Sequence, residues 1–109
     1  MARMLDFTTQ KKEYLTVKLN DEKGTVLMIG TPTKKILEEF VLINEQMNNE
    51  VTADVVNDIY NVCAKIMSFN KGGIKITPDD LGEFFDLGDI TLFFEVYGKF
   101  MNTVTGAKN

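Results

Sequence analysis

The segment from residue 53 to residue 70 limits the possible folds most strongly, because it reads as a helix with very little polar surface. On a helical wheel its polar stripe is only about 100° wide. That stripe consists of Asp54, Asn57, Asp58, Asn61, Lys65 and Ser68. A helix with so much apolar surface has to be covered on two sides, so we predict that it is the central helix of the fold.

Two short segments near the start of the chain have the pattern of β-strands. Residues 13–19 alternate between apolar and polar side chains, as a half-buried strand does. A polar turn with Gly24, which can adopt a positive φ, leads to the apolar run 25–29. We predict a β-hairpin over about 13–29, packed on helices because two strands alone are marginally stable. Residues 5–7 are expected to add a short strand or to cover an edge.

The helix before the central one is expected to begin at Thr31-Pro32, where a hydroxyl cap precedes a proline at the first helical position. It is predicted to run over about 32–48. Leu42 does not fit its pattern, because it lies among polar residues. The side chains that share the core-facing side are Ile36, Phe40, Ile43 and Met47.

Capping residues mark the ends of the central helix. Thr52 can cap its start with a side-chain oxygen. Gly72 or Gly73 is expected to end it in the left-handed conformation that glycine favours. These signals place the central helix at about 53–70.

Two shorter patterns complete the chain. Thr77-Pro78, followed by two acids, predicts a helix over about 78–86, because the acids suit the positive end of the helix dipole. Asp89 is expected to cap a last helix from 90 to about 104. We therefore predict an α+β fold that is mainly α, in which an N-terminal hairpin packs on a bundle of about four helices.

Size and composition fit a single domain of residues 1–109. Hydrophobic residues make up 44% of the 109 positions, which is enough for a core without disulfides or metals. The N-terminus lacks the apolar stretch of a signal peptide, and no run approaches the about 18 apolar residues of a membrane span. These features predict a soluble intracellular protein.

The absence of histidine excludes several kinds of active site. With one cysteine, Cys63, and no histidine, the chain cannot form Ser-His-Asp or Cys-His arrangements or zinc sites built from Cys and His. Cys63 lies among apolar residues of the central helix and is expected to be buried. We expect a non-enzymatic protein with no cofactor and no metal.

Acidic residues around the third helix leave two interpretations open. A carboxylate pair there could bind a metal or transfer protons. In the alternative, which we favour, Asp79, Asp80 and Asp89 interact with helix N-termini. Glu83 and Asp86 then face solvent.

Charge is unevenly distributed along the chain. Residues 1–35 carry about +3 and residues 36–109 about −7, which gives the formal net charge of −4. The negative total disfavours non-specific binding to nucleic acid and to anionic membranes. Two interpretations of the asymmetry remain: solvated surfaces, or head-to-tail self-association between a basic and an acidic end.

The last helix has more apolar side chains than a core-facing stripe needs. That stripe is filled by Ile90, Phe93, Phe94, Tyr97, Phe100, Met101 and Val104. Other apolar residues extend beyond it or lie on neighbouring helices. We predict a partner-binding role for Leu42, Phe84, Phe85, Leu92 and Val96. The alternative is that the short helix and the N-terminal segment cover them.

Three stretches together carry a family resemblance: LDFTTQKKEYLTVKLNDEKG at 5–24, TPTKKILEEF at 31–40 and NKGGIKITPDDLGEFFDLGDITLFFEVYGKFM at 70–101. The chain resembles the tail assembly chaperones of long-tailed bacteriophages and prophages of Gram-positive bacteria. The resemblance implies a small helical protein in the cytoplasm of the bacterial host. It also implies binding to the tape-measure protein, which is kept soluble while tail tube subunits polymerise around it. The alternative function is a structural or connector component of the phage virion.

Overall fold

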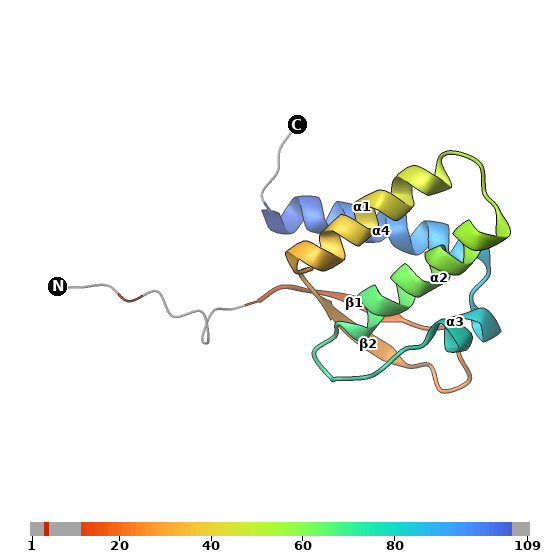
Figure 1. Ribbon diagram of the computed structural model, residues 1–109. Helices are drawn as coiled ribbons and strands as arrows, with labels where there is room; N and C mark the ends of the chain where they lie inside the picture. Colours follow the sequence, from red (N-terminus) through yellow and green to blue (C-terminus); the bar gives the residue numbers. More distant parts are fainter. Residues whose placement is uncertain (1–3, 5–11, 106–109) are drawn as a thin grey trace.

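The computed structural model describes residue 4 and residues 12–105, and it contains a hairpin followed by helices. Helices α1 and α2 form one layer, and α4 and the hairpin lie behind them (Figure 1). The predicted α+β, mainly helical fold is confirmed. The predicted strand or edge cover at 5–7 lies outside the described residues. The elements are β1 (Tyr14–Lys18), β2 (Val26–Gly30), α1 (Lys34–Met47), α2 (Ala53–Ser68), α3 (Pro78–Phe84) and α4 (Leu87–Thr105).

The hairpin has one buried and one exposed face. β1 and β2 pair antiparallel, with Tyr14 opposite Gly30. Gly24 has the predicted positive φ, at 63°. Beside it, the Asp21 carboxylate accepts hydrogen bonds from the backbone N–H of Thr25 at 2.8 Å and from its hydroxyl at 2.6 Å. The hydroxyl bond, followed by the backbone bond, lowers the pKa of Asp21 and fixes the turn.

Helix α2 is central, as predicted. It packs against α1, α3, α4 and β2. Its buried side chains point to these neighbours rather than to a single side: Ile59, Cys63, Ala64, Ile66 and Met67. This arrangement follows from the narrow polar stripe, because only coverage on several sides removes so much apolar surface from water.

Aromatic side chains join α1 to α4. The Phe40 ring lies edge-on to Phe94, with centroids 5.3 Å apart, and edge-on to Tyr97, with centroids 5.1 Å apart. Such geometry places the positive edge of one ring against the negative face of another. Phe40 and Ile43 are buried, and Ile36 and Met47 pack partly buried against the core, so the predicted face of α1 is correct.

The predicted start of α1 is wrong by two residues. Thr33, not Thr31, caps the helix, and its hydroxyl accepts a hydrogen bond from the Ile36 N–H at 3.5 Å. Pro32 therefore precedes the cap instead of occupying the first helical position. Thr33 offers the same hydroxyl two residues later, and its extended backbone lets the chain leave β2 before the helix begins.

The junction between α3 and α4 also differs from the prediction. The reciprocal Thr77–Asp80 cap and Pro78 start α3 as expected, but α3 ends at Phe84 and α4 begins at Leu87. Asp86 caps α4, because its carboxylate accepts the Asp89 N–H at 2.8 Å. The Asp89 carboxylate in turn accepts the Asp86 N–H at 3.0 Å. Asp89 is thus the third helical residue of a capping box, not the cap, and Asp86 is not a purely solvent-facing acid.

Helix α2 ends at Ser68, before the predicted glycine stop. Its C-terminal cap is Phe69, with φ −86°, and the left-handed Gly73, with φ +68°, lies in the turn that follows. The chain leaves the helix early because it runs beside β2. There the Gly30 N–H donates to the Phe69 carbonyl at 3.0 Å, and the Lys71 N–H donates to the Met28 carbonyl at 2.9 Å.

Candidate functional site

The structure separates the residues that the sequence assigns to partner binding. Leu92 and Val96 are 60% and 40% exposed, and Leu42 is 58% exposed. Phe84 and Phe85 are half-buried against the core. Phe85, Leu92 and Val96 line one groove, whereas Leu42 and Phe84 line two other hollows.

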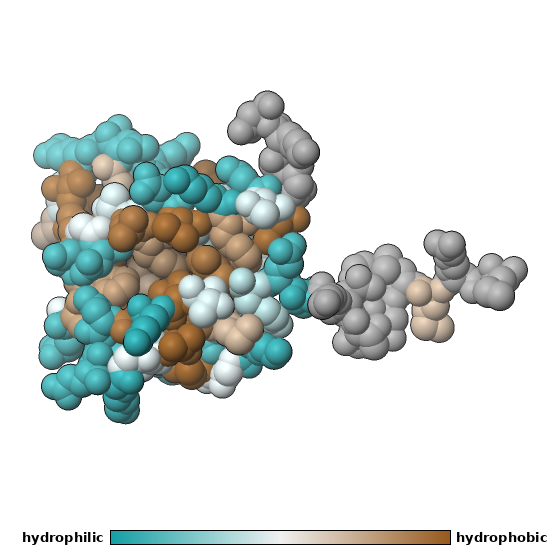
Figure 2. Space-filling view, turned by 180° about the vertical axis from the view of Figure 1, so that it is seen from behind, coloured by the Kyte–Doolittle hydropathy of each residue, from teal (hydrophilic) through white to brown (hydrophobic). Residues whose placement is uncertain are grey.

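The groove shared by Phe85, Leu92 and Val96 lies between β1 and the first half of α4, and we call it the β1/α4 groove. It has a volume of about 320 Å³. Figure 2 views the molecule from behind Figure 1 and shows a band of apolar surface between hydrophilic borders. The apolar lining of the groove consists of Leu15, Val17, Phe85, Leu92, Phe93 and Val96, and Lys18 and Asp89 are among its polar residues.

Helix α4 presents two different sides to its surroundings. Ile90, Phe93 and Phe94 are buried and hold the helix on the core. Leu92 and Val96 are four residues apart, so they lie one above the other on a side that the core does not reach. The groove therefore results from a helix whose apolar arc is wider than its contact with the rest of the molecule.

A hydrogen bond from α2 fixes the end of the groove. The Tyr60 hydroxyl donates to the Phe85 carbonyl at 2.8 Å, so the turn between α3 and α4 is tied to the central helix. Burial, followed by the nearby Asp86 carboxylate, raises the pKa of Tyr60. The Phe85 ring lies edge-on to Phe84, with centroids 5.4 Å apart, which orients both side chains.

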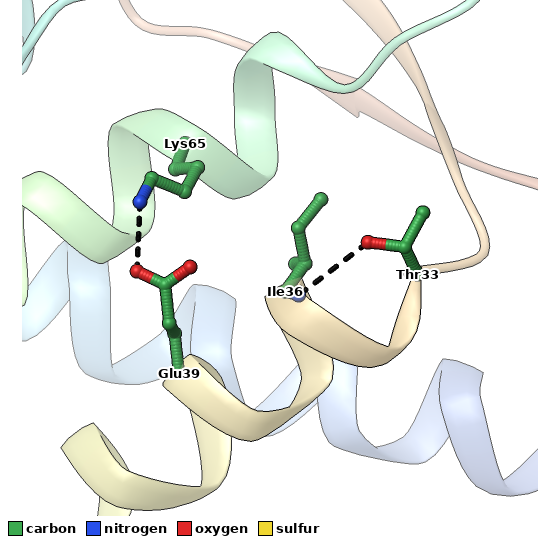
Figure 3. A network of polar contacts seen from close by, with 4 residues as sticks. All are labelled: Thr33, Ile36, Glu39 and Lys65. Carbon is green, nitrogen blue, oxygen red and sulfur yellow. Dashed lines mark hydrogen bonds and ion pairs between the residues drawn. The ribbon is translucent and has the colours of Figure 1, made fainter.

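Leu42 lies outside this groove, in a hollow between α1 and α2. In the same hollow, Lys65 Nζ and Glu39 Oε1 form an ion pair at 2.7 Å, and Figure 3 shows these two side chains meeting between the helices. Leu37 and Val41 were not predicted to be surface residues, although they are 39% and 48% exposed. Their place at the margin of the core-facing stripe was the only sequence signal.

Groups that could carry bond-making chemistry are few in the part of the chain that the structure describes. Cys63 is buried in α2, and burial raises the pKa of its thiol, which disfavours the reactive thiolate. Among residues 4 and 12–105, no group of three His, Cys, Asp or Glu side chains could hold a metal ion. No helix within these residues is long and apolar enough to cross a membrane.

Tyr97 gives a prediction for stability at alkaline pH. Burial raises its pKa from 10.0 to about 12, because the phenolate is disfavoured away from water. The unfolded chain therefore loses the proton first, and the stability that neutral Tyr97 contributes below pH 10.0 is lost as the pH rises to about 12. Urea unfolding measured across this range should show a smaller loss in Tyr97→Phe, which has no proton to release. An equal loss in both proteins would contradict the assignment to Tyr97.

The β1/α4 groove suits the binding of apolar side chains, since an exposed apolar surface gains free energy when a partner covers it. Comparisons with protein-family models, curated proteins and solved structures give no match.

Proposed function

We propose that this protein is a non-enzymatic tail assembly chaperone of a long-tailed bacteriophage or prophage. In this role it binds the tape-measure protein in the host cytoplasm and keeps it soluble while the tail tube forms. The proposal is supported by the resemblance in residues 5–24, 31–40 and 70–101. It is also supported by apolar side chains that the fold leaves uncovered.

The observation that carries the proposal is the apolar part of the outer side of α1. Leu37, Val41 and Leu42 are all exposed, and we call these three residues the α1 surface. Leu37 and Val41 lie one turn apart, and Leu42 lies beside Val41. A partner helix with apolar residues at every third or fourth position could pack along this surface.

The charge of the protein suits a solubilising role. Glu38 and Glu45 lie between the apolar residues of the α1 surface, and the chain has a formal net charge of −4. A net charge away from zero keeps a protein soluble, so an acidic protein bound along an apolar partner would oppose aggregation of the complex. Binding of this kind requires no catalytic group.

Co-expression with the tape-measure protein of the same phage tests the proposal. The wild-type protein should keep the tape-measure protein in the soluble fraction and co-purify with it. Val41→Lys with Leu42→Lys should weaken the complex at least roughly tenfold, because burial of one aliphatic side chain contributes about 1.5–3 kcal/mol. The measurements are the soluble amount of the partner and the affinity of the purified complex.

Lys34→Ala is the matched control for this experiment, because Lys34 lies on the same helix and its exposed ion pair with Glu38 contributes little. It should leave the soluble amount unchanged. If the wild-type protein neither co-purifies with the tape-measure protein nor increases its solubility, the proposal is wrong. Mass spectrometry of purified virions separates the alternative, since a structural or connector component would be present in stoichiometric amounts.

A further inference from the structure

Within residues 12–105, no strand or loop pairs with the outer edge of β1, which we call the open edge. The Leu19 N–H donates to the Thr25 carbonyl at 2.7 Å. Leu19 and Thr25 are thus a hydrogen-bonded pair that continues the register in which Tyr14 lies opposite Gly30. Because hydrogen-bonded pairs alternate with non-bonded pairs along an antiparallel ladder, the N–H and C=O groups of Leu15 and Val17 also point toward β2. The N–H and C=O groups of Tyr14, Thr16 and Lys18 therefore point away from it. None of the described residues forms a hydrogen bond with these outward groups.

The outward backbone groups of β2, in contrast, have hydrogen-bond partners. Met28 and Gly30 point their backbone groups away from β1, and residues 69–71 pair with them. Among the described residues, one edge of this small sheet is thus covered and the other is not. An uncovered edge recognises one class of ligand, an extended polypeptide, because only such a chain offers donors and acceptors at the matching spacing.

The open edge and the β1/α4 groove form one continuous surface. Four successive residues of β1, Leu15 to Lys18, line the groove, and α4 provides Leu92 and Val96 on its other side. A strand laid along β1 would therefore place every second side chain against α4, since side chains alternate along a strand. The site requires an extended segment with apolar residues two positions apart.

The N-terminal arm of the chain, residues 1–12, has this pattern. Leu5 and Phe7 are two positions apart and are followed by the polar residues TTQKK. The arm has three basic residues and one acidic residue, and the groove lining carries the Asp89 carboxylate together with one basic residue, Lys18. The arm thus matches the groove in its apolar spacing, and its basic residues can pair with the Asp89 carboxylate.

We propose that the arm of a second copy of this chain binds in the β1/α4 groove as an added strand on β1. The arm leads directly into β1, and Met4 is 86% exposed within its own copy. Pairing between copies satisfies the outward groups of Tyr14, Thr16 and Lys18 and buries Leu92 and Val96 together. This self-association concerns a different surface from the α1 surface, and it stands independently of the proposed phage role.

Molar mass measured by light scattering on the full chain, from micromolar to near-millimolar concentration, tests the inference. The wild-type protein should exceed its monomer mass of 12.3 kDa as concentration rises. Thr16→Pro should remain monomeric yet folded, because the Thr16 N–H takes no part in the hairpin ladder and proline is tolerated at an outward edge position. Leu5→Lys with Phe7→Lys, and Leu92→Lys with Val96→Lys, should also lose association. Leu42→Lys, equally exposed but outside the groove, should retain it.

A labelled synthetic peptide of the sequence MARMLDFTTQKK gives a second measurement that does not depend on assembly. It should bind the Leu5→Lys, Phe7→Lys chain, whose groove is free, and should lose at least about tenfold in affinity when Thr16→Pro is added. A wild-type protein that stays monomeric at every concentration overturns the proposal. If the peptide still binds in that case, the occupant of the groove is the arm of the same chain. If the peptide does not bind, the occupant is a different protein. Association that survives Thr16→Pro and both lysine pairs also overturns it.

Discussion

Phe40→Ala is expected to destabilise the protein by about 3–5 kcal/mol, which is a large part of the stability of a small domain. Phe40 is buried where α1 crosses α4, and its ring touches both Phe94 and Tyr97. Truncation removes apolar contact and leaves a cavity that the surrounding rings fill only partly. It also removes two edge-to-face contacts. Urea unfolding followed by far-UV circular dichroism measures the change.

Val41→Ala is the matched control, because Val41 is the next residue of α1 and is 48% exposed. It should change the free energy of unfolding by no more than about 0.5 kcal/mol, since its side chain makes few core contacts and alanine favours the helix. A cost below about 1 kcal/mol for Phe40→Ala would show that α1 and α4 do not share the described core.

Periodicity predicted the helices well where one face of a segment is clearly apolar. The narrow polar stripe of residues 53–70 indicated a central helix, and the spacing of Phe40 and Ile43 indicated the inner side of α1. These patterns report burial directly, since a helix turns by a constant angle per residue. Neither inference depends on the exact end of a helix.

Helix ends were predicted less well because several residues can serve as the same cap. Thr31 and Thr33 both offer a hydroxyl before α1, and Asp86 and Asp89 both offer a carboxylate before α4. Which of two such residues caps the helix depends on the path of the chain between elements. At the end of α2, the hydrogen bond from the Gly30 N–H to the Phe69 carbonyl determines where the helix stops. This contact joins residues that are far apart in the sequence.

The candidate site was predictable in part. The excess apolar width of the last helix correctly indicated that Leu92 and Val96 are exposed. The contribution of Leu15 and Val17 to the same groove was not predictable, because their alternation looks the same whether helices cover them completely or partly. The open edge of β1 likewise depends on which segments flank the hairpin, and residues 69–71 flank only β2.

Ile29→Ala is the second substitution with a large expected effect, at about 2–5 kcal/mol. Ile29 lies on β2 with its side chain fully buried, in the part of the sheet that packs on α2. A two-stranded hairpin is marginal alone, so its stability depends on this contact. We therefore expect the hairpin and the helices to unfold together, with one urea midpoint for circular dichroism and for tyrosine fluorescence, which is informative because the chain has no tryptophan.

Met28→Ala tests the same strand from its other face, because Met28 is 39% exposed and its backbone bond to Lys71 does not involve the side chain. It should lower the free energy of unfolding by less than about 1 kcal/mol, because removing this partly exposed side chain leaves little buried cavity. If Ile29→Ala cost no more than Met28→Ala, the hairpin would not be part of the core. The open edge of β1 would then be a property of a loosely attached ribbon, and Thr16→Pro could act by detaching it. A large difference between Ile29→Ala and Met28→Ala, with a single transition in both, would show that the hairpin unfolds as part of the core, as strand addition to β1 requires.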